Sequence, residues 1–106
     1  MEKAVKFDFG KTRYDLLPLE ALEETGKVLS YGAAKYVPNN WRKGFAYSRL
    51  TSAALRHLFA WMRGEKLDPE SGLHHLAHCT SNIMFLLEIE LTGCGIDDRV
   101  ITKAQE

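Results

Sequence analysis

The feature that most constrains this sequence is an apolar stretch, residues 73–91, that also carries regularly spaced polar side chains. Its aliphatic and aromatic residues fall on all sides of a helix, which is typical of a helix buried within a domain or between subunits. Ser71, His75, His78 and Asn82 follow one another at spacings that put them on one helical face. Buried polar groups are costly without partners, so this face predicts bonds to one another, to water, to a metal or to a ligand.

Helix-breaking residues divide the chain into three helical segments, predicted over about residues 18–36, 47–63 and 69–91. Pro18 suits the first turn of a helix, and Pro38 ends the same helix. Asp68 followed by Pro69 is the usual pattern of an N-cap and a first helical residue, so the third helix is expected to begin there. Little strand signal remains. We therefore predict an all-α bundle of three main helices, completed by oligomerisation.

The 106 residues match the size of a single domain, 1–106. Within it we expect residues 1–17 to form an N-terminal arm, packed on the body or on a second subunit. Residues 94–106 are expected to form a loosely ordered tail, and Gly93 to end the third helix.

Charge and composition exclude some classes of partner. Fourteen basic residues balance fourteen acidic ones, so a nucleic-acid polymer or an anionic membrane is not an expected partner. No apolar run is long enough to span a bilayer, and the first residues lack the apolar core of a signal peptide. Cys79 and Cys94 form no paired-cysteine motif. These features favour the cytoplasm.

Carboxylates and a further histidine are expected close to the polar face. Glu65, Asp68 and Glu70 cluster in the turn before the third helix, and His57 on the second helix can point toward the same place. Imidazole nitrogens and carboxylates both bind divalent metals. Two simpler interpretations stay open: Asp68 as a helix cap, and His57 as a hydrogen-bonded core residue. No glycine-rich phosphate loop is present, so any phosphate would be held by metal and basic side chains.

Several runs of the sequence, taken in order, resemble a known family. They are Arg13-Tyr14-Asp15-Leu16-Leu17-Pro18, Tyr31-Gly32-Ala33-Ala34-Lys35-Tyr36, Asn40-Trp41, Arg56-His57-Leu58, Gly64-Glu65-x-x-Asp68-Pro69-Glu70-Ser71-Gly72, His75-Leu76-Ala77-His78 and Asn82. Together they resemble the dATP/dGTP diphosphohydrolase domain, which is found largely in phages and prophages. That family is related to the MazG-like all-α nucleotide pyrophosphohydrolases. The resemblance covers roughly residues 11–91.

The resemblance implies a helical enzyme that assembles as a dimer or tetramer. It implies Mg²⁺- or Mn²⁺-dependent cleavage of a deoxynucleoside triphosphate, dGTP or dATP, to the monophosphate and pyrophosphate. MazG-like enzymes carry E-E-x-x-E on one helix and E-x-x-D on the next. Glu20-x-x-Glu23-Glu24 matches the first pattern only in part, and Glu65-x-x-Asp68 matches the second in a predicted loop. The metal ligands are therefore chosen from the residues themselves.

Candidate roles follow from chemistry. The candidate metal ligands are Glu65, Asp68, Glu70, His75 and His78; the candidate catalytic residues are Glu65 and His57; the candidate substrate-binding residues are Lys35, Tyr36, Asn40, Trp41, Arg56 and Asn82. Cationic side chains would stabilise phosphate charge, and an aromatic ring would stack on the base unless it packs in the core.

Two other functions remain open. One is a metal-dependent phosphohydrolase that removes a terminal phosphate. The other is a non-catalytic helical oligomer in which the histidines and Asn82 form a polar interface seam. Product analysis distinguishes the two enzymes. Replacement of His75 and His78 by alanine should abolish turnover but leave the oligomer intact in an enzyme, whereas it should disrupt the oligomer if the histidines form an interface.

Overall fold

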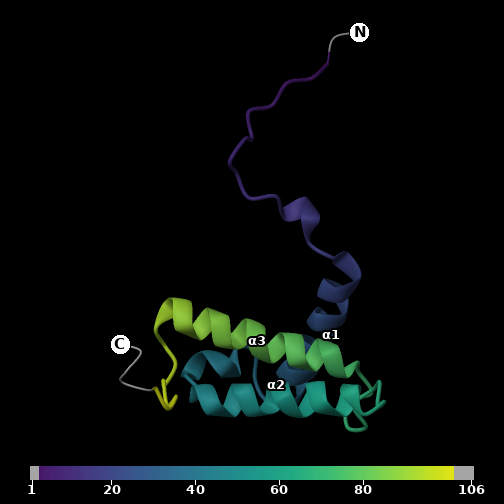
Figure 1. Ribbon diagram of the computed structural model, residues 1–106, viewed down its shortest axis with the longest axis vertical. Helices are drawn as coiled ribbons and strands as arrows, with labels where there is room; N and C mark the ends of the chain where they lie inside the picture. The colour runs from purple at the N-terminus through teal and green to yellow at the C-terminus, as the bar shows by residue number, and fades with distance from the viewer. Residues whose placement is uncertain (1–2, 102–106) are drawn as a thin grey trace.

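The computed structural model describes residues 3–101, and these contain three α-helices (Figure 1). They are α1 (Leu19–Lys35), α2 (Tyr47–Met62) and α3 (His75–Thr92), with two short 3-10 helices, η1 (Tyr14–Leu16) and η2 (Asn40–Lys43). Within residues 3–101 the extended pairing consists of two isolated β-bridges. The predicted all-α class is therefore confirmed. The same residues include no helix with the length and apolarity that a bilayer crossing requires.

The core lies where α2 begins and α3 ends. α3 packs along α2 and also contacts α1 (Figure 1). Tyr47 and Leu50 of α2 meet Ile89 of α3, whose side chain is fully buried. Four partly buried side chains surround this cluster: Trp41, Phe45, Phe85 and Leu86. The η2 segment is thereby fixed against the α2–α3 pair, which positions one wall of the site described below.

The segment after α3 is bound to the start of α2. Gly93 ends the helix in the left-handed conformation, as predicted (φ 73°). Ile96 then pairs with the backbone around Ala46, and Asp98 accepts hydrogen bonds from the backbone N–H and hydroxyl of Ser48. The expectation of a loosely ordered tail is therefore wrong for residues 94–101, because this segment supplies the N-terminal cap that α2 itself lacks. Residues 102–106 lie outside the described part.

The third helix begins six residues later than expected. Asp68 does accept a hydrogen bond from the Ser71 backbone, but the turn then closes through Gly72, which has a φ of 72° and donates to the Asp68 carbonyl. A bridge between Leu67 and His74 follows, and His74 caps α3. The start predicted at residue 69 is therefore wrong, because the local cap produces one isolated turn. α1 and α2 lie close to their predicted bounds.

The buried side of α1 is centred on Thr25 and Val28 rather than on its leucines. Thr25 and Val28 are buried, while Leu22 and Leu29 are each 38% exposed. The arm, residues 3–17, is exposed and runs away from the helices (Figure 1). It therefore does not pack on the body of its own chain. Contact with a second subunit stays a prediction, and residues 1–2 lie outside the described part.

Candidate active site

A cleft of about 960 Å³ opens between α1 and the α2–α3 pair. The second half of α1 and the η2 loop form one side, and α2, the 63–74 loop and α3 form the other. A volume of this size is within the range of small-molecule sites in proteins. The buried end of the cleft reaches the histidines of α2 and α3.

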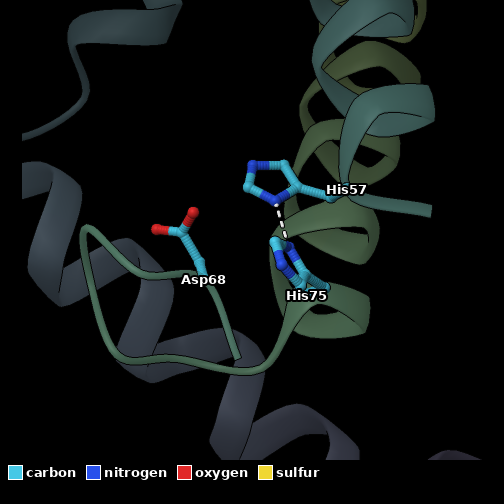
Figure 2. Close-up of side chains that lie close together, drawn as sticks. All are labelled: His57, Asp68 and His75. Atoms are coloured by element: carbon cyan, nitrogen blue, oxygen red, sulfur yellow. Dashed lines mark hydrogen bonds between the residues drawn. The ribbon is translucent and has the colours of Figure 1, made fainter. Parts of the chain in front are cut away.

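Three side chains from separate parts of the chain meet at that end (Figure 2). His57 of α2, His75 at the start of α3 and Asp68 of the connecting loop each place a ligand-type atom within 4.8 Å of the other two. The two imidazoles are joined directly, with 2.9 Å between the two Nδ1 atoms. His75 is 3% exposed. The residues thus offer two nitrogens and a carboxylate oxygen to one small volume.

Glu65 determines which nitrogen of His75 carries a proton. Its Oε1 lies 2.6 Å from His75 Nε2. An ionised carboxylate can only accept, so Nε2 is the protonated nitrogen and Nδ1 presents its lone pair to His57. In this arrangement His57 Nδ1 donates to His75 Nδ1. Glu65 itself does not line the cleft.

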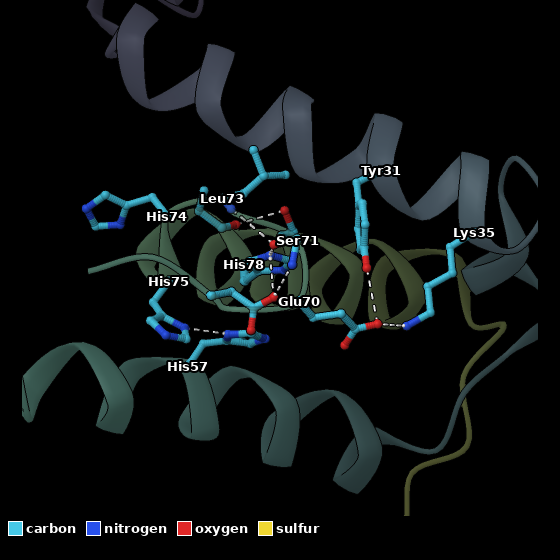
Figure 3. A network of polar contacts seen from close by, with 12 residues as sticks. Tyr31, Lys35, His57, Glu70, Ser71, Leu73, His74, His75 and His78 are labelled. Carbon is cyan, nitrogen blue, oxygen red and sulfur yellow. Dashed lines mark hydrogen bonds and ion pairs between the residues drawn. The ribbon is translucent and has the colours of Figure 1, made fainter. Parts of the chain in front are cut away.

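His78 belongs to a neighbouring set of contacts. Its Nε2 lies 2.7 Å from the hydroxyl of Ser71 and 3.8 Å from Asp68 Oδ2. Its ring lies flat on His57, with centroids 4.4 Å apart and 9° between the planes (Figure 3). Imidazole lone pairs lie in the ring plane, so two stacked rings direct them along parallel planes. His57 and His78 therefore do not face the same ligand point.

Burial keeps two of the imidazoles neutral. It lowers the pKa of His57, and the neighbouring His78 lowers it further. Burial also lowers the pKa of His78, although Asp68 partly opposes this. For Asp68 itself burial alone would raise the pKa, but hydrogen bonds from Ser71 outweigh it and hold the pKa below its usual range. Near neutral pH the site therefore combines neutral imidazoles with an ionised carboxylate.

A second polar group lies further along the cleft (Figure 3). Glu70 accepts hydrogen bonds from Lys35 and, at 3.1 Å, from Tyr31. The Lys35 ammonium lowers the pKa of Glu70, and Glu70 in turn raises the pKa of Lys35. Tyr31 also meets the His78 ring edge-on. Glu70 is thus paired with α1 residues and lies outside the His57–Asp68–His75 group.

The structure gathers most of the predicted site residues along one cleft. Its lining includes all six candidate substrate-binding residues: Lys35, Tyr36, Asn40, Trp41, Arg56 and Asn82. Of the candidate metal ligands and catalytic residues, it includes His57, Asp68, Glu70 and His78. Glu65, which is exposed, and His75, which is buried, do not line the cleft. Trp41 stacks on Phe85 at 4.9 Å and has Arg42 over its ring. Tyr36 is 61% exposed, so its ring is the more available of the two for stacking on a base.

Tyr31 and Arg49 are cleft residues with polar side chains that were not selected from the sequence as site residues. Tyr31 lies one helical turn before Lys35, so the i, i+4 spacing on one face of α1 was the available signal. Arg49 also lines the cleft, with its guanidinium 5.3 Å from the centre of the Phe45 ring. It lies seven residues before Arg56, or about two helical turns, which is again a signal of a shared face.

The fold and the site together define an all-α protein with a histidine-carboxylate cluster at the end of a cleft lined by cationic and aromatic residues. A model of the family described as dATP/dGTP diphosphohydrolase, N-terminal, matches residues 1–99, and the chain belongs to this family. The resemblance inferred from the sequence is thereby confirmed.

One curated relative is a dATP/dGTP diphosphohydrolase of Salmonella phage PMBT28. It is 37% identical over 95 residues, which are 90% of this chain and 32% of the relative. The chain therefore spans about a third of the length of that relative. No solved structure matches the chain.

Proposed function

We propose that this chain hydrolyses deoxynucleoside triphosphates, with dGTP and dATP favoured, to the monophosphate and pyrophosphate. The observation that carries the proposal is that one cleft is lined both by cationic side chains and by His57 and Asp68 of the histidine-carboxylate group. Membership of a family described by dATP/dGTP diphosphohydrolase activity, and the same name on the Salmonella phage relative, support the substrate class.

The volume of the cleft, about 960 Å³, leaves room for a triphosphate attached to a base. Lys35 and Arg56 would hold the phosphates, and Tyr36 would stack on the base while Asn40 contacts its edge. Lys35 must then exchange Glu70 for a phosphate oxygen, which costs little because this ion pair is solvent-exposed. Arg56 forms no ion pair among residues 3–101 in this structure and is free to bind anion.

The other end of the cleft would carry out the reaction. The donor set there, two imidazoles and a carboxylate, can hold a divalent cation. The family resemblance makes Mg²⁺ or Mn²⁺ the expected ion. When bound, such an ion would neutralise phosphate charge and polarise the α-phosphoryl group. His57 and His78 line the cleft as neutral imidazoles, and whichever of them does not hold the ion can accept a proton from an attacking water. Glu65 would act through His75, which it orients.

The test is product analysis on the purified chain. Each deoxy- and ribonucleoside triphosphate is incubated with Mg²⁺, with Mn²⁺ or with chelator, and products are separated by anion-exchange chromatography. Monophosphate and pyrophosphate formed only with metal would support the proposal and give the base preference. Diphosphate with free phosphate would instead identify an enzyme that removes the terminal phosphate. Absence of turnover on every substrate would contradict hydrolysis by this part of the protein.

The same proposal includes self-association and a cytoplasmic site of action. Long rows of apolar side chains on α2 and α3 stay exposed, as expected of a bundle completed by a second copy. Deoxynucleoside triphosphates are cytoplasmic metabolites, so the host cytoplasm is where a phage enzyme of this class would meet them.

A further inference from the structure

We infer that His57, Asp68 and His75 form a binding site for a first-row transition-metal ion, in the range from Mn²⁺ to Zn²⁺, and that Glu65 is the positioning residue of this site. The inference deepens the proposed function and rests on it for its biological role, because it names the ion that the same cleft would use. Its evidence is the arrangement of the four side chains.

The spacing of the donor atoms suits an ion of this size. Bonds of about 2.0–2.2 Å to nitrogen and oxygen keep any two ligand atoms within about 4.4 Å of each other. The three donor atoms already lie within 4.8 Å of one another, so side-chain shifts of a few tenths of an ångström would let all three bind one ion. The two Nδ1 atoms are 2.9 Å apart and need to open only slightly to admit an ion between them.

The ligand chemistry favours a transition metal over Mg²⁺. Mg²⁺ prefers hard oxygen ligands in near-ideal octahedral geometry, and this group offers one carboxylate. Imidazole nitrogens suit first-row transition ions such as Fe²⁺, Ni²⁺ and Zn²⁺, and the affinity of a site of nitrogen and oxygen ligands rises from Mn²⁺ to Co²⁺. The carboxylates that would suit Mg²⁺ better are engaged elsewhere, Glu70 with Lys35 and Tyr31, and Glu65 with His75.

The contact between Glu65 and His75 is the usual outer-shell contact of a metal-binding histidine. Such a residue commonly donates its second ring N–H to a carboxylate, which fixes the tautomer and the ring orientation. His75 Nε2 makes this bond to Glu65 Oε1, and His75 Nδ1 is left facing His57 (Figure 2). His75 has few alternative orientations, since it is buried at the first residue of α3.

His78 lies outside this ligand set. Its ring is stacked on His57, and its Nε2 is bonded to Ser71. With His57 on the ion, His78 is the imidazole left on the cleft wall for proton transfer. His75 and His78 therefore have different roles, although the sequence pattern places both on the same helical face.

Metal binding can be measured directly on the untagged chain. We expect Co²⁺ to give a visible d–d absorption band that Zn²⁺ removes, and calorimetry to find Mn²⁺ or Zn²⁺ bound more tightly than Mg²⁺ by about two orders of magnitude. His57→Ala and Asp68→Asn should abolish the Co²⁺ band. Glu65→Gln, which keeps the shape of the side chain, should weaken affinity by about 10- to 100-fold.

Two histidine variants serve as controls. His74 caps α3 and its ring points away from the cluster (Figure 3), so His74→Ala should bind Co²⁺ as the parent does. His78→Ala should also keep the band. Circular dichroism confirms folding of each variant, and the near-isosteric Glu65→Gln and Asp68→Asn changes keep the test valid where an alanine variant fails to fold.

The outcomes separate this inference from the proposed function. Loss of the Co²⁺ band in His78→Ala with retention in His57→Ala would overturn the ligand set. Tight Mg²⁺ binding with no Co²⁺ band would overturn the choice of ion, even if turnover were found. A Co²⁺ band that follows the predicted variants, together with absence of nucleotide turnover, would uphold the metal site and refute the proposed hydrolysis.

Discussion

His57 and His75 show how far apart in the sequence the parts of a small site can lie. His75 contacts His57 eighteen residues away and Glu65 ten residues away, and it is almost completely buried among them. A buried imidazole with both nitrogens bonded has one orientation available.

Arg56 is the cationic side chain whose role is most directly testable. Arg56→Ala should lower kcat/KM for a deoxynucleoside triphosphate by about 10- to 100-fold, because a charge-assisted phosphate contact is worth about 1.5–3 kcal/mol. Arg63 on the same segment does not line the cleft and lies near Phe59, so Arg63→Ala is the matched control. Steady-state kinetics on both variants provides the measurement. Equal effects in the two would show that Arg56 has no specific role.

Gly44 is a residue that the fold requires to be glycine. Its φ is 92°, and a Cβ there would lie 2.3 Å from the backbone oxygen of Cys94. Gly44→Ala should therefore destabilise the chain by about 1–3 kcal/mol in urea unfolding. Gly26 lies within α1, where an added Cβ would meet nothing within 4 Å, so Gly26→Ala should be neutral or stabilising by up to about 1 kcal/mol. An unfolding midpoint for Gly44→Ala equal to that of the parent chain would contradict the close approach.

At the scale of the elements, the sequence predicts where helices exist better than where they begin. The all-α class, the approximate bounds of α1 and α2, and the end of α3 at Gly93 follow from proline, glycine and apolar spacing. The start of α3 does not, because Asp68 and Pro69 satisfy a local cap that Gly72 then interrupts. A cap signal fixes one turn, while continuation of the helix depends on tertiary contacts such as the Leu67–His74 bridge.

The inward face of α1 was equally difficult to predict. Leu22 and Leu29 lie at helical spacing, yet Thr25 and Val28 are the residues that α1 buries. Apolar residues occur on more than one side of this helix, and the position of α3 decides which side is covered. For the site, the residue types and their approximate neighbourhood could be predicted. The pairing of Glu65 with His75, and of Glu70 with Lys35, depends on the path of a loop that local patterns do not encode.

The start of α2 gives a prediction about pH. Asp98 accepts two hydrogen bonds from Ser48, and the Ser48 side chain holds the pKa of Asp98 below its usual value of 3.8. Because the folded-state pKa is lower than the unfolded one, this contribution is fully present above about pH 4 and is lost as the pH falls through the folded pKa. Asp98→Asn should therefore lower the thermal midpoint at neutral pH, and the difference from the parent chain should shrink below pH 4. Thermal melts at pH 7, 4 and 3 measure it; a gap that stays constant across the three would contradict the cap.

At the scale of the whole molecule, the chain exposes more surface than a protein of its mass usually does. Its accessible surface is 8644 Å², against about 6,000 Å² for a typical monomer of 12.0 kDa. Part of the surplus belongs to the extended arm, residues 3–17. The rest includes an apolar row on each of two helices, Leu55, Phe59 and Met62 on α2 and Ile83, Leu87 and Leu91 on α3. Each partner buries about 800 Å² in a standard interface, so the surplus is large enough for one.

A second copy of the chain is the expected cover for the α3 row. Leu87 lies at its middle and is 57% exposed, so Leu87→Glu places a charge where two apolar surfaces would meet. Light scattering coupled to size exclusion should give a dimer or tetramer mass for the parent chain and a monomer mass for Leu87→Glu, with helical circular dichroism retained. Val100→Glu, on the exposed segment after α3, is the control and should keep the parent mass.

A monomeric parent chain would contradict self-association through α3. The α3 row would then need a different partner. A further part of a longer protein is one candidate, since this chain matches only 32% of the length of the relative from Salmonella phage PMBT28. The turnover assay distinguishes the two arrangements further. If self-association shapes the cleft, Leu87→Glu should lose activity together with mass, although Leu87 does not line the cleft. If the cleft is complete within one chain, the variant should become monomeric and keep its kcat/KM.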